Sequence, residues 1–206
     1  MARKRSARRV EIDSGRSLLF AGTDFAKAIA SAVEQLQAAQ RALLSAACPN
    51  IDDALRINLR DLSAERINEV LRAVPAGHCK AEKGVDYIYV IEVSEQQAQL
   101  VATLRSRLIE ARKTANDYPR VNGGNEATTT LYVGRSKTLR SRLRQHLGAG
   151  SRGVYALHLQ RWATGNDAEI AISAMKFDGA EDLLVQAVED GLWASLKPAF
   201  GRKGEK

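Results

Sequence analysis

The middle of the chain combines a tyrosine, an arginine and a histidine in a segment without acidic residues. Tyr132 is followed by Arg142 and His146, and no aspartate or glutamate occurs from residue 127 to residue 166. An arginine can bind two oxygens of a phosphoryl group at once, and a histidine one helical turn later can accept or relay a proton. The spacing therefore predicts a phosphate-binding surface that can carry acid–base chemistry. The other basic residues expected there are Arg135, Lys137, Arg140, Arg144, Arg152 and Arg161.

For this chemistry, one helix must place basic residues along both edges of its buried face. The helix expected over residues 137–147 has leucine at every fourth position, which predicts its core face. At 100° per residue, Arg142 and His146 lie at one half-buried margin of that face, and Arg140 and Arg144 lie at the other, facing solvent. On helical spacing alone, a snorkelling arginine and a capping histidine are the simpler interpretation of the first pair.

A carboxylate near the end of the chain is placed in a similar way. A closing helix is expected over residues 181–196, and Glu189 falls between its apolar arc and Trp193. A charge at such an edge needs a partner, because leaving it unpaired is costly. A metal ion or Arg142 would satisfy it, and a structural ion pair within the fold is the alternative.

The apolar patterns around these residues predict an α+β fold. Strands are expected at residues 85–93, 128–133 and 169–177, where β-branched and aromatic residues cluster or alternate. Ser94 with Gln97 forms a capping-box pattern at the start of a helix that reaches about Ala115. A further short helix is expected from Val154 to Trp162.

The N-terminal part has a different composition. Residues 1–9 contain five basic residues and no acidic one, which indicates a flexible basic arm. Alanine-rich, amphipathic patterns predict helices over residues 23–47 and from Ser63 to the residue before Pro75. Residues 10–80 therefore form a mainly helical region in this interpretation. We expect it to pack on the remainder of the chain or to form a homodimer with a second copy.

Composition favours an anionic partner. The net charge is +7, so a polyanion is the first partner to consider and an anionic membrane surface the second. No apolar run approaches the roughly 18 residues of a membrane span, so we expect a soluble, cytoplasmic protein. Cys48 and Cys79 have no ligand spacing for zinc, and reduced thiols explain them.

Taken in order along the chain, these features resemble the GIY-YIG nuclease family. The resemblance covers about residue 84 to the C-terminus. It rests on Tyr87-Ile88-Tyr89-Val90-Ile91, Leu131-Tyr132-Val133-Gly134, Arg142 with His146, Glu189 and Pro198. It implies that residues 81–206 form a small three-stranded antiparallel sheet flanked by helices, with an insertion at about residues 94–127.

The resemblance also implies a chemistry. A member of this family hydrolyses DNA phosphodiester bonds with one divalent ion, Mg²⁺ with Mn²⁺ as a substitute, held chiefly by the glutamate, here Glu189. Tyr89, helped by Tyr132 or His146, would deprotonate the attacking water, and Arg142 would stabilise the pentacovalent phosphate. Arg202 and Lys203 would join the basic residues named above as nucleic-acid contacts.

Three departures from the family pattern keep other interpretations open. Tyr87 replaces the first motif glycine; the long insertion offers its own contacts; and Gly201 stands where many members carry an asparagine. A neighbouring residue could replace that asparagine, with Arg202 and Lys203 closest in the sequence, and Asn125 and Asn166 are candidate substitutes from elsewhere in the chain. Loss of it would leave a catalytically weakened nucleic-acid-binding module, and a third interpretation is a structural partner assembled by the N-terminal helices. The insertion's candidate contacts are Arg105, Arg107, Arg112, Lys113 and Arg120.

Overall fold

The computed structural model describes most of the chain in two compact units, residues 1–44 and 45–206. The described residues are 22–45, 54–74, 80–114, 118–125, 127–151 and 153–203. The expected basic arm, both cysteines and Arg152 lie outside them. None of the helices in these ranges is both long enough and apolar enough to cross a membrane.

The first unit contains one described helix, α1 (Gly22–Ser45), close to the bounds that its alanine-rich sequence predicts. Three large apolar side chains of α1, Phe25, Ile29 and Leu36, are between 52% and 69% exposed. They belong to a longer series in which apolar residues alternate in steps of four and three. The full series is Phe25, Ile29, Ala32, Leu36, Ala39 and Leu43.

The second unit is built on an antiparallel sheet of four strands in the order β1-β4-β2-β3. The strands are β1 (Leu55–Asn58), β2 (Val85–Val93), β3 (Thr130–Ser136) and β4 (Glu169–Asp178). The α+β class is thus confirmed, but the expected count of three strands is wrong. The sequence prediction missed β1, because four residues that pair along one edge with β4 have too few positions to show an alternating pattern.

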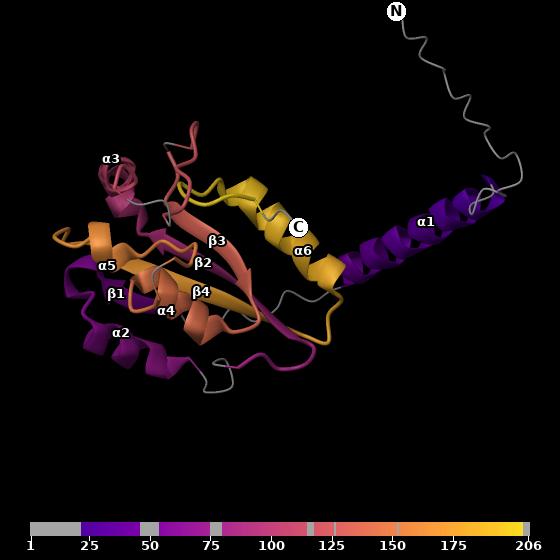
Figure 1. Cartoon of the computed structure of the whole chain (residues 1–206), viewed down its shortest axis with the longest axis horizontal. Helices are drawn as coiled ribbons and strands as arrows, with labels where there is room; N and C mark the ends of the chain where they lie inside the picture. Colours follow the sequence, from indigo (N-terminus) through magenta and orange to yellow (C-terminus); the bar gives the residue numbers. More distant parts are fainter. Residues whose placement is uncertain are drawn as a thin grey trace, which may run out of the picture. The chain divides into compact units, whose positions relative to one another are not determined.

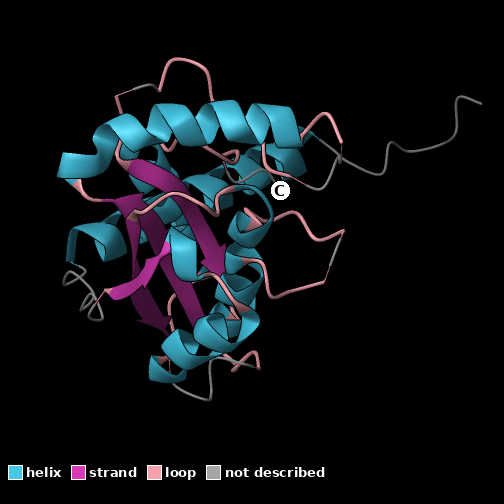
Figure 2. Ribbon diagram, turned by 90° about the vertical axis from the view of Figure 1, so that its left-hand side faces the viewer, coloured by secondary structure: helices cyan, strands magenta, loops and turns pink. Residues whose placement is uncertain are grey.

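Helices cover both faces of this sheet (Figure 2). They are α2 (Ala64–Val70), α3 (Ala98–Ala111), α4 (Leu139–Leu147), α5 (Leu159–Trp162) and α6 (Asp182–Leu196). Three-residue 3₁₀ turns lie at Leu59–Asp61, Leu71–Ala73 and Glu95–Gln97. The ends of α2 and α4 follow from their sequence. The Ser63 hydroxyl accepts the Arg66 N–H at the start of α2, and Gly148, at φ 116°, ends α4.

Alternation along β2 divides the core into two layers. Tyr87, Tyr89 and Ile91 face the larger layer, which also buries Ile67 of α2 and leucines of α3, α4 and α5. Ile88, on the other face, packs with Phe177 and the apolar side of α6. Figure 1 shows α6 on one side of the strands, and α2, α4 and α5 on the other. Tyr89 therefore lies in the layer that β2 shares with α4, whereas α6 packs against the opposite face of the sheet.

Three local expectations need correction. Ser94 lies at the start of a 3₁₀ turn and its side chain makes no capping hydrogen bond, while the Gln97 Oε1 atom is buried without a partner among the described residues. The helix expected from Val154 includes only residues 159–162, because Gly153 and His158 both adopt positive φ. Residues 54–74, expected within a helical region, belong to the sheet unit because β1 and α2 pack into its core.

Candidate functional site

Tyr89 and Tyr132 lie on one face of neighbouring strands, above Gly134. Tyr89 is the cross-strand partner of Gly134, and Tyr132 lies two residues before that glycine, so both rings point to the same side. The rings are stacked, with centroids 6.2 Å apart. A Cβ atom at Gly134 would lie 2.6 Å from the Tyr89 hydroxyl and 2.7 Å from the Tyr132 ring. Only glycine at position 134 leaves room for both phenols.

Helix α4 brings Arg142 and His146 to these phenols. The Nε2 atom of His146 lies 2.8 Å from the Tyr89 hydroxyl oxygen, and the Nε–H of Arg142 donates to the same oxygen over 3.3 Å. The His146 and Tyr132 rings have centroids 4.5 Å apart. We call Tyr89, Tyr132, Arg142 and His146 the phenol cluster. The sequence-predicted residues of β2, β3 and α4 are therefore in mutual contact.

The protonation of His146 follows from its two partners. Its Nδ1 atom accepts the backbone N–H of Leu157 at 3.1 Å and so carries no proton in the neutral ring. The proton then resides on Nε2, which donates to Tyr89. Burial, followed by the positive charge of Arg142, lowers the pKa of His146 well below its usual range, which keeps the ring neutral. The sequence prediction placed His146 at a half-buried margin, but it is fully buried.

The phenols and the guanidinium affect one another electrostatically. Burial raises the pKa of the Tyr89 and Tyr132 hydroxyls, and the positive charge of Arg142 opposes that rise. Burial also lowers the pKa of Arg142, but the two phenols outweigh it and the net pKa is raised. Tyr89 has no exposed surface, whereas Tyr132 is 6% exposed. A solvent molecule therefore reaches the Tyr132 side of the cluster first.

Glu189 is a half-buried residue of α6. Its negative charge is close enough to raise the pKa of both tyrosines. Within the described ranges, its carboxylate accepts only a long hydrogen bond, 3.4 Å, from Gln186 and forms no ion pair. Burial raises the pKa of Glu189, and the charge of Arg135 opposes the rise. The half-buried carboxylate thus lacks the close cationic partner that its position predicts, and Arg142 does not supply one.

A single carboxylate is compatible with a divalent ion that keeps most of its water ligands. No group of three or more histidine, cysteine, aspartate or glutamate side chains that could hold a metal occurs in the described part of the chain. Mg²⁺ differs from zinc in that it usually keeps several waters and uses one or two carboxylates together with substrate phosphates. Glu189 is the residue that could hold such an ion here.

Gly201 lies directly against Tyr132. It adopts φ +95°, and a Cβ atom there would lie 2.7 Å from the Tyr132 ring. An asparagine at this position would collide with the phenol cluster and strain the backbone. Of the two candidate substitutes, the Asn166 amide donates to Ala163 O near α5, whereas the Asn125 amide donates to Pro198 O, three residues before Gly201.

The loop with Asn125 and the C-terminal segment enclose a basic pocket. The Asn122 amide also donates to Pro198 O, at 2.9 Å, and Gly201 N–H donates to Arg120 O. The guanidinium of Arg202 lies 5.1 Å from the centre of the Tyr155 ring. We call this space, about 250 Å³, the C-terminal pocket. Its lining residues are Arg120, Asn122, Gly123, Asn125, Trp193, Arg202 and Lys203.

The remaining basic residues differ in their exposure and in whether other protein groups already accept their N–H groups. Arg135, expected as a nucleic-acid contact, is instead held by Asp86, at 2.8 Å from Nε, and by Asp182, so few of its N–H groups remain. Lys137 and Arg144 are exposed, and Arg140 is half-buried. Of the insertion arginines, Arg105 and Arg107 donate to backbone carbonyls and stabilise the fold.

Sequence reasoning missed three participants in the site. Gln145 accepts a hydrogen bond from Arg142 Nη1 at 3.0 Å, and its spacing of three residues on one helix could have predicted this. The Leu157 N–H, which fixes the His146 tautomer, belongs to the backbone and leaves no sequence signal. Tyr155 accepts the Arg120 N–H at 3.0 Å from a loop whose path the sequence does not indicate.

Comparisons of this chain with protein-family models, with curated proteins and with solved structures found no match.

Proposed function

We propose that this protein is a metal-dependent endonuclease of the GIY-YIG type that hydrolyses phosphodiester bonds in DNA. The observation that carries the proposal is the hydrogen bonding of the Tyr89 hydroxyl oxygen. His146 Nε2 lies 2.8 Å from this oxygen, and the Nε–H of Arg142 donates to it over 3.3 Å. Two donors, one of them cationic, oppose the rise in the pKa of Tyr89 that burial causes, and so favour its phenolate relative to an equally buried phenol without them. Glu189, without an ion-pair partner in the described chain, lies close enough to affect its pKa.

Each residue of the cluster has a separate part in the proposed reaction. Water attacks the phosphorus atom while Tyr89, as the phenolate, takes its proton, and Tyr132 guides the water because it has the exposed edge. Arg142 donates its remaining N–H groups to the phosphoryl oxygens, whose negative charge grows in the transition state. The bond to the leaving oxygen breaks, and that oxygen takes a proton from solvent.

His146 positions the phenol and takes no proton itself. Its Nδ1 is occupied by the Leu157 N–H, and its Nε2 already carries a proton. The raised pKa of Tyr89 means that the phenolate needs further positive charge nearby. A divalent ion, Mg²⁺ or Mn²⁺, bound at Glu189 would supply that charge and neutralise the phosphoryl group.

Cleavage of a labelled DNA duplex tests the proposal. We expect Mg²⁺-dependent cleavage that falls by about 10²-fold or more in Arg142→Ala and in Tyr89→Phe, since each removes a group that acts on developing charge. Tyr132→Phe, which keeps the same ring stacking, should lose less. Absence of cleavage in Mg²⁺ and Mn²⁺ on duplex, branched and single-stranded DNA and on RNA would reject the proposal.

A nucleic-acid-binding module without turnover is the second candidate. Gly201 favours it, because the asparagine of the family pattern has no room beside Tyr132. The complete burial of Tyr89 points the same way. Binding that survives Glu189→Ala, with no cleavage in either metal, would support this function in place of the first.

We also propose that α1 pairs with a second copy of the chain. The alternating steps of four and three in Phe25, Ile29, Ala32, Leu36, Ala39 and Leu43 are the heptad spacing of a coiled coil. Alanine and glutamine dominate the flanking positions, so no like charges oppose pairing.

A further inference from the structure

We propose that a pocket between α2 and α4 binds a second phosphate of the nucleic-acid backbone, away from the one that is cleaved. The inference rests on the proposed function, because it adds a contact to the same substrate. The pocket measures about 190 Å³, on the order of six water molecules at about 30 Å³ each, which admits a phosphoryl group. We call it the α2–α4 pocket. Its lining residues are Asn68, Leu71, Arg72, Arg140, Ser141 and Arg144.

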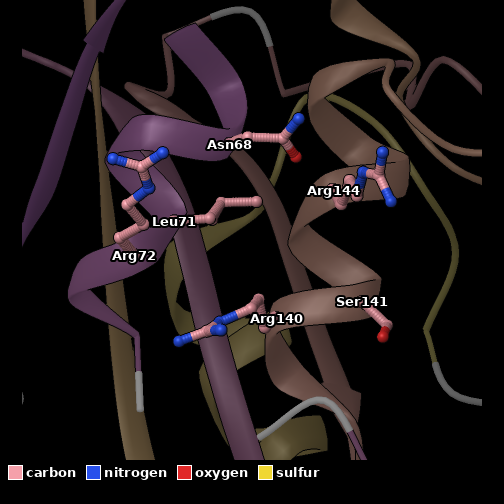
Figure 3. A pocket seen from close by; sticks show the side chains of 6 residues that line it. All are labelled: Asn68, Leu71, Arg72, Arg140, Ser141 and Arg144. Atoms are coloured by element: carbon pink, nitrogen blue, oxygen red, sulfur yellow. The ribbon is translucent and has the colours of Figure 1, made fainter. Parts of the chain in front are cut away.

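The lining has the chemistry of an anion site. Three arginines from two different elements line it together with an amide and a hydroxyl, and no acidic residue lines the pocket. Figure 3 shows Asn68 and Leu71 extending from one side of the gap and Arg140 extending across it from α4. Planar guanidinium groups on two sides can bind different oxygens of one phosphate.

Arg140 is available in a way that Arg135 is not. Its Nε atom is buried without a hydrogen-bond partner in the part of the chain that the structure describes. Arg135, by contrast, is committed to Asp86 and Asp182. The carboxylate of Glu69, which Arg72 affects electrostatically, is engaged by Arg66 at 2.8 Å. The positive charge of the pocket is therefore not cancelled by its surroundings.

The pocket and the phenol cluster lie on different sides of α4. Arg140 and Arg142 are two residues apart, which at 100° per residue places them on nearly opposite faces of the helix. A helix with its side chains is about 10–12 Å wide, and a DNA strand advances about 3.4 Å per nucleotide. A substrate that touches both sites must therefore span roughly three nucleotides or more. A small phosphodiester can reach only one of them.

The test compares a long substrate, which can touch both sites, with a small phosphodiester, which can touch only one. The double variant Arg72→Ala/Arg140→Ala is compared with Lys80→Ala/Lys83→Ala, which removes the same charge at exposed positions near the start of β2. The probes are a fluorescein-labelled 20-base-pair DNA duplex and bis(p-nitrophenyl) phosphate, with inorganic phosphate as competitor. Because Arg140 is half-buried, Arg72→Glu, at an exposed position, provides a variant that should fold normally.

We expect the Kd for the duplex to rise about tenfold or more at low salt in the α2–α4 variants. The slope of log affinity against log salt should become shallower by about 1 for the phosphate lost. The kcat/KM should fall at least tenfold more for the duplex than for bis(p-nitrophenyl) phosphate. The lysine control should change neither quantity by more than twofold.

The outcomes separate this inference from the proposed function. Normal cleavage with affinity and salt slope equal to those of the lysine control would overturn the pocket assignment and leave the nuclease intact. No cleavage by any variant, with the loss of duplex affinity still confined to the α2–α4 variants, would reject the nuclease and keep the pocket. Inorganic phosphate that competes only weakly, above about 10 mM, supports a backbone site. Micromolar phosphate binding without an effect on duplex affinity would instead identify a free-phosphate site.

Discussion

The Nε2 atom of His146 lies 2.8 Å from the Tyr89 hydroxyl oxygen, while Nδ1 of the same ring accepts the Leu157 N–H. The backbone of one loop thereby fixes the tautomer of a histidine and, through it, the hydrogen bonding of a buried phenol. Because both ring nitrogens of His146 are engaged in these hydrogen bonds, the geometry supports a positioning role for His146 and not a role as proton acceptor.

Two substitutions of His146 separate its two hydrogen bonds. The asparagine oxygen can replace Nδ1, and the glutamine nitrogen can replace Nε2. His146→Asn should keep the Leu157 bond but lower the cleavage rate by about 10²-fold, because Tyr89 loses a donor. His146→Gln should retain more activity and cost about 1–3 kcal/mol in unfolding free energy, because the Leu157 N–H is left unpaired. Equal activity in both variants, measured beside urea unfolding, would contradict the positioning role.

The pH dependence of stability should report the neutral state of His146. Its pKa in the folded protein lies well below its value of about 6.5 in the unfolded chain. Below pH 6.5 the unfolded state therefore binds more protons, and the free energy of unfolding falls as pH falls, by up to about 1.4 kcal/mol per pH unit. Above that pH His146 is neutral in both states, so it does not make the free energy of unfolding depend on pH. Urea unfolding of the wild type and of His146→Asn from pH 5 to 8 measures this pH dependence of the free energy of unfolding. The variant should lose the part that His146 contributes.

Sequence and structure agree where the periodicity is strong. The leucines of α4 predicted its core face, and the run of β-branched and aromatic residues predicted β2. The association of Arg142 with Tyr89 was implied by the family resemblance and not by periodicity, and the structure brings the two side chains into contact. The charged residues were harder to place, because pairing depends on neighbours far apart in sequence. Arg135 looked free for phosphate, yet Asp86 lies beside it across the β2–β3 pair. The Leu157 N–H could not be predicted at all, since any residue there would supply it.

Glu189→Gln should separate metal binding from nucleic-acid binding. The substitution removes a half-buried charge without an ion-pair partner among the described residues, so the free energy of unfolding should stay the same or rise slightly. Metal-dependent cleavage should be lost, while duplex affinity without metal should be unchanged or higher, because a negative charge near the phosphates is gone. Water proton relaxation with Mn²⁺ measures ion binding without relying on activity. Unchanged Mn²⁺ binding in this variant would show that Glu189 does not hold the ion.

Placing the asparagine of the GIY-YIG pattern at position 201 should destabilise the protein. Gly201 adopts φ +95°, and a Cβ atom would lie 2.7 Å from the Tyr132 ring. We expect Gly201→Asn and Gly201→Ala each to lower the free energy of unfolding by about 1–3 kcal/mol and to reduce cleavage by displacing Tyr132. Asn125→Ala, in the C-terminal pocket, should weaken substrate binding with a smaller effect on stability. Cleavage that increases in Gly201→Asn would contradict this expectation and show that Gly201 limits cleavage by the wild-type protein.

The proposed self-association through α1 depends on the heptad positions that Ile29 and Leu36 occupy, seven residues apart. A helix of 24 residues gains most of its stability from packing of its apolar face, and two copies can bury these side chains against each other. Ile29→Lys/Leu36→Lys should therefore convert a dimer into a monomer in sedimentation equilibrium at micromolar concentration. Glu34→Lys changes the net charge by the same two units on the opposite side of α1 and should leave the dimer intact. A wild-type chain that is monomeric at 100 µM would exclude this pairing, and the exposed apolar face would then require a different partner.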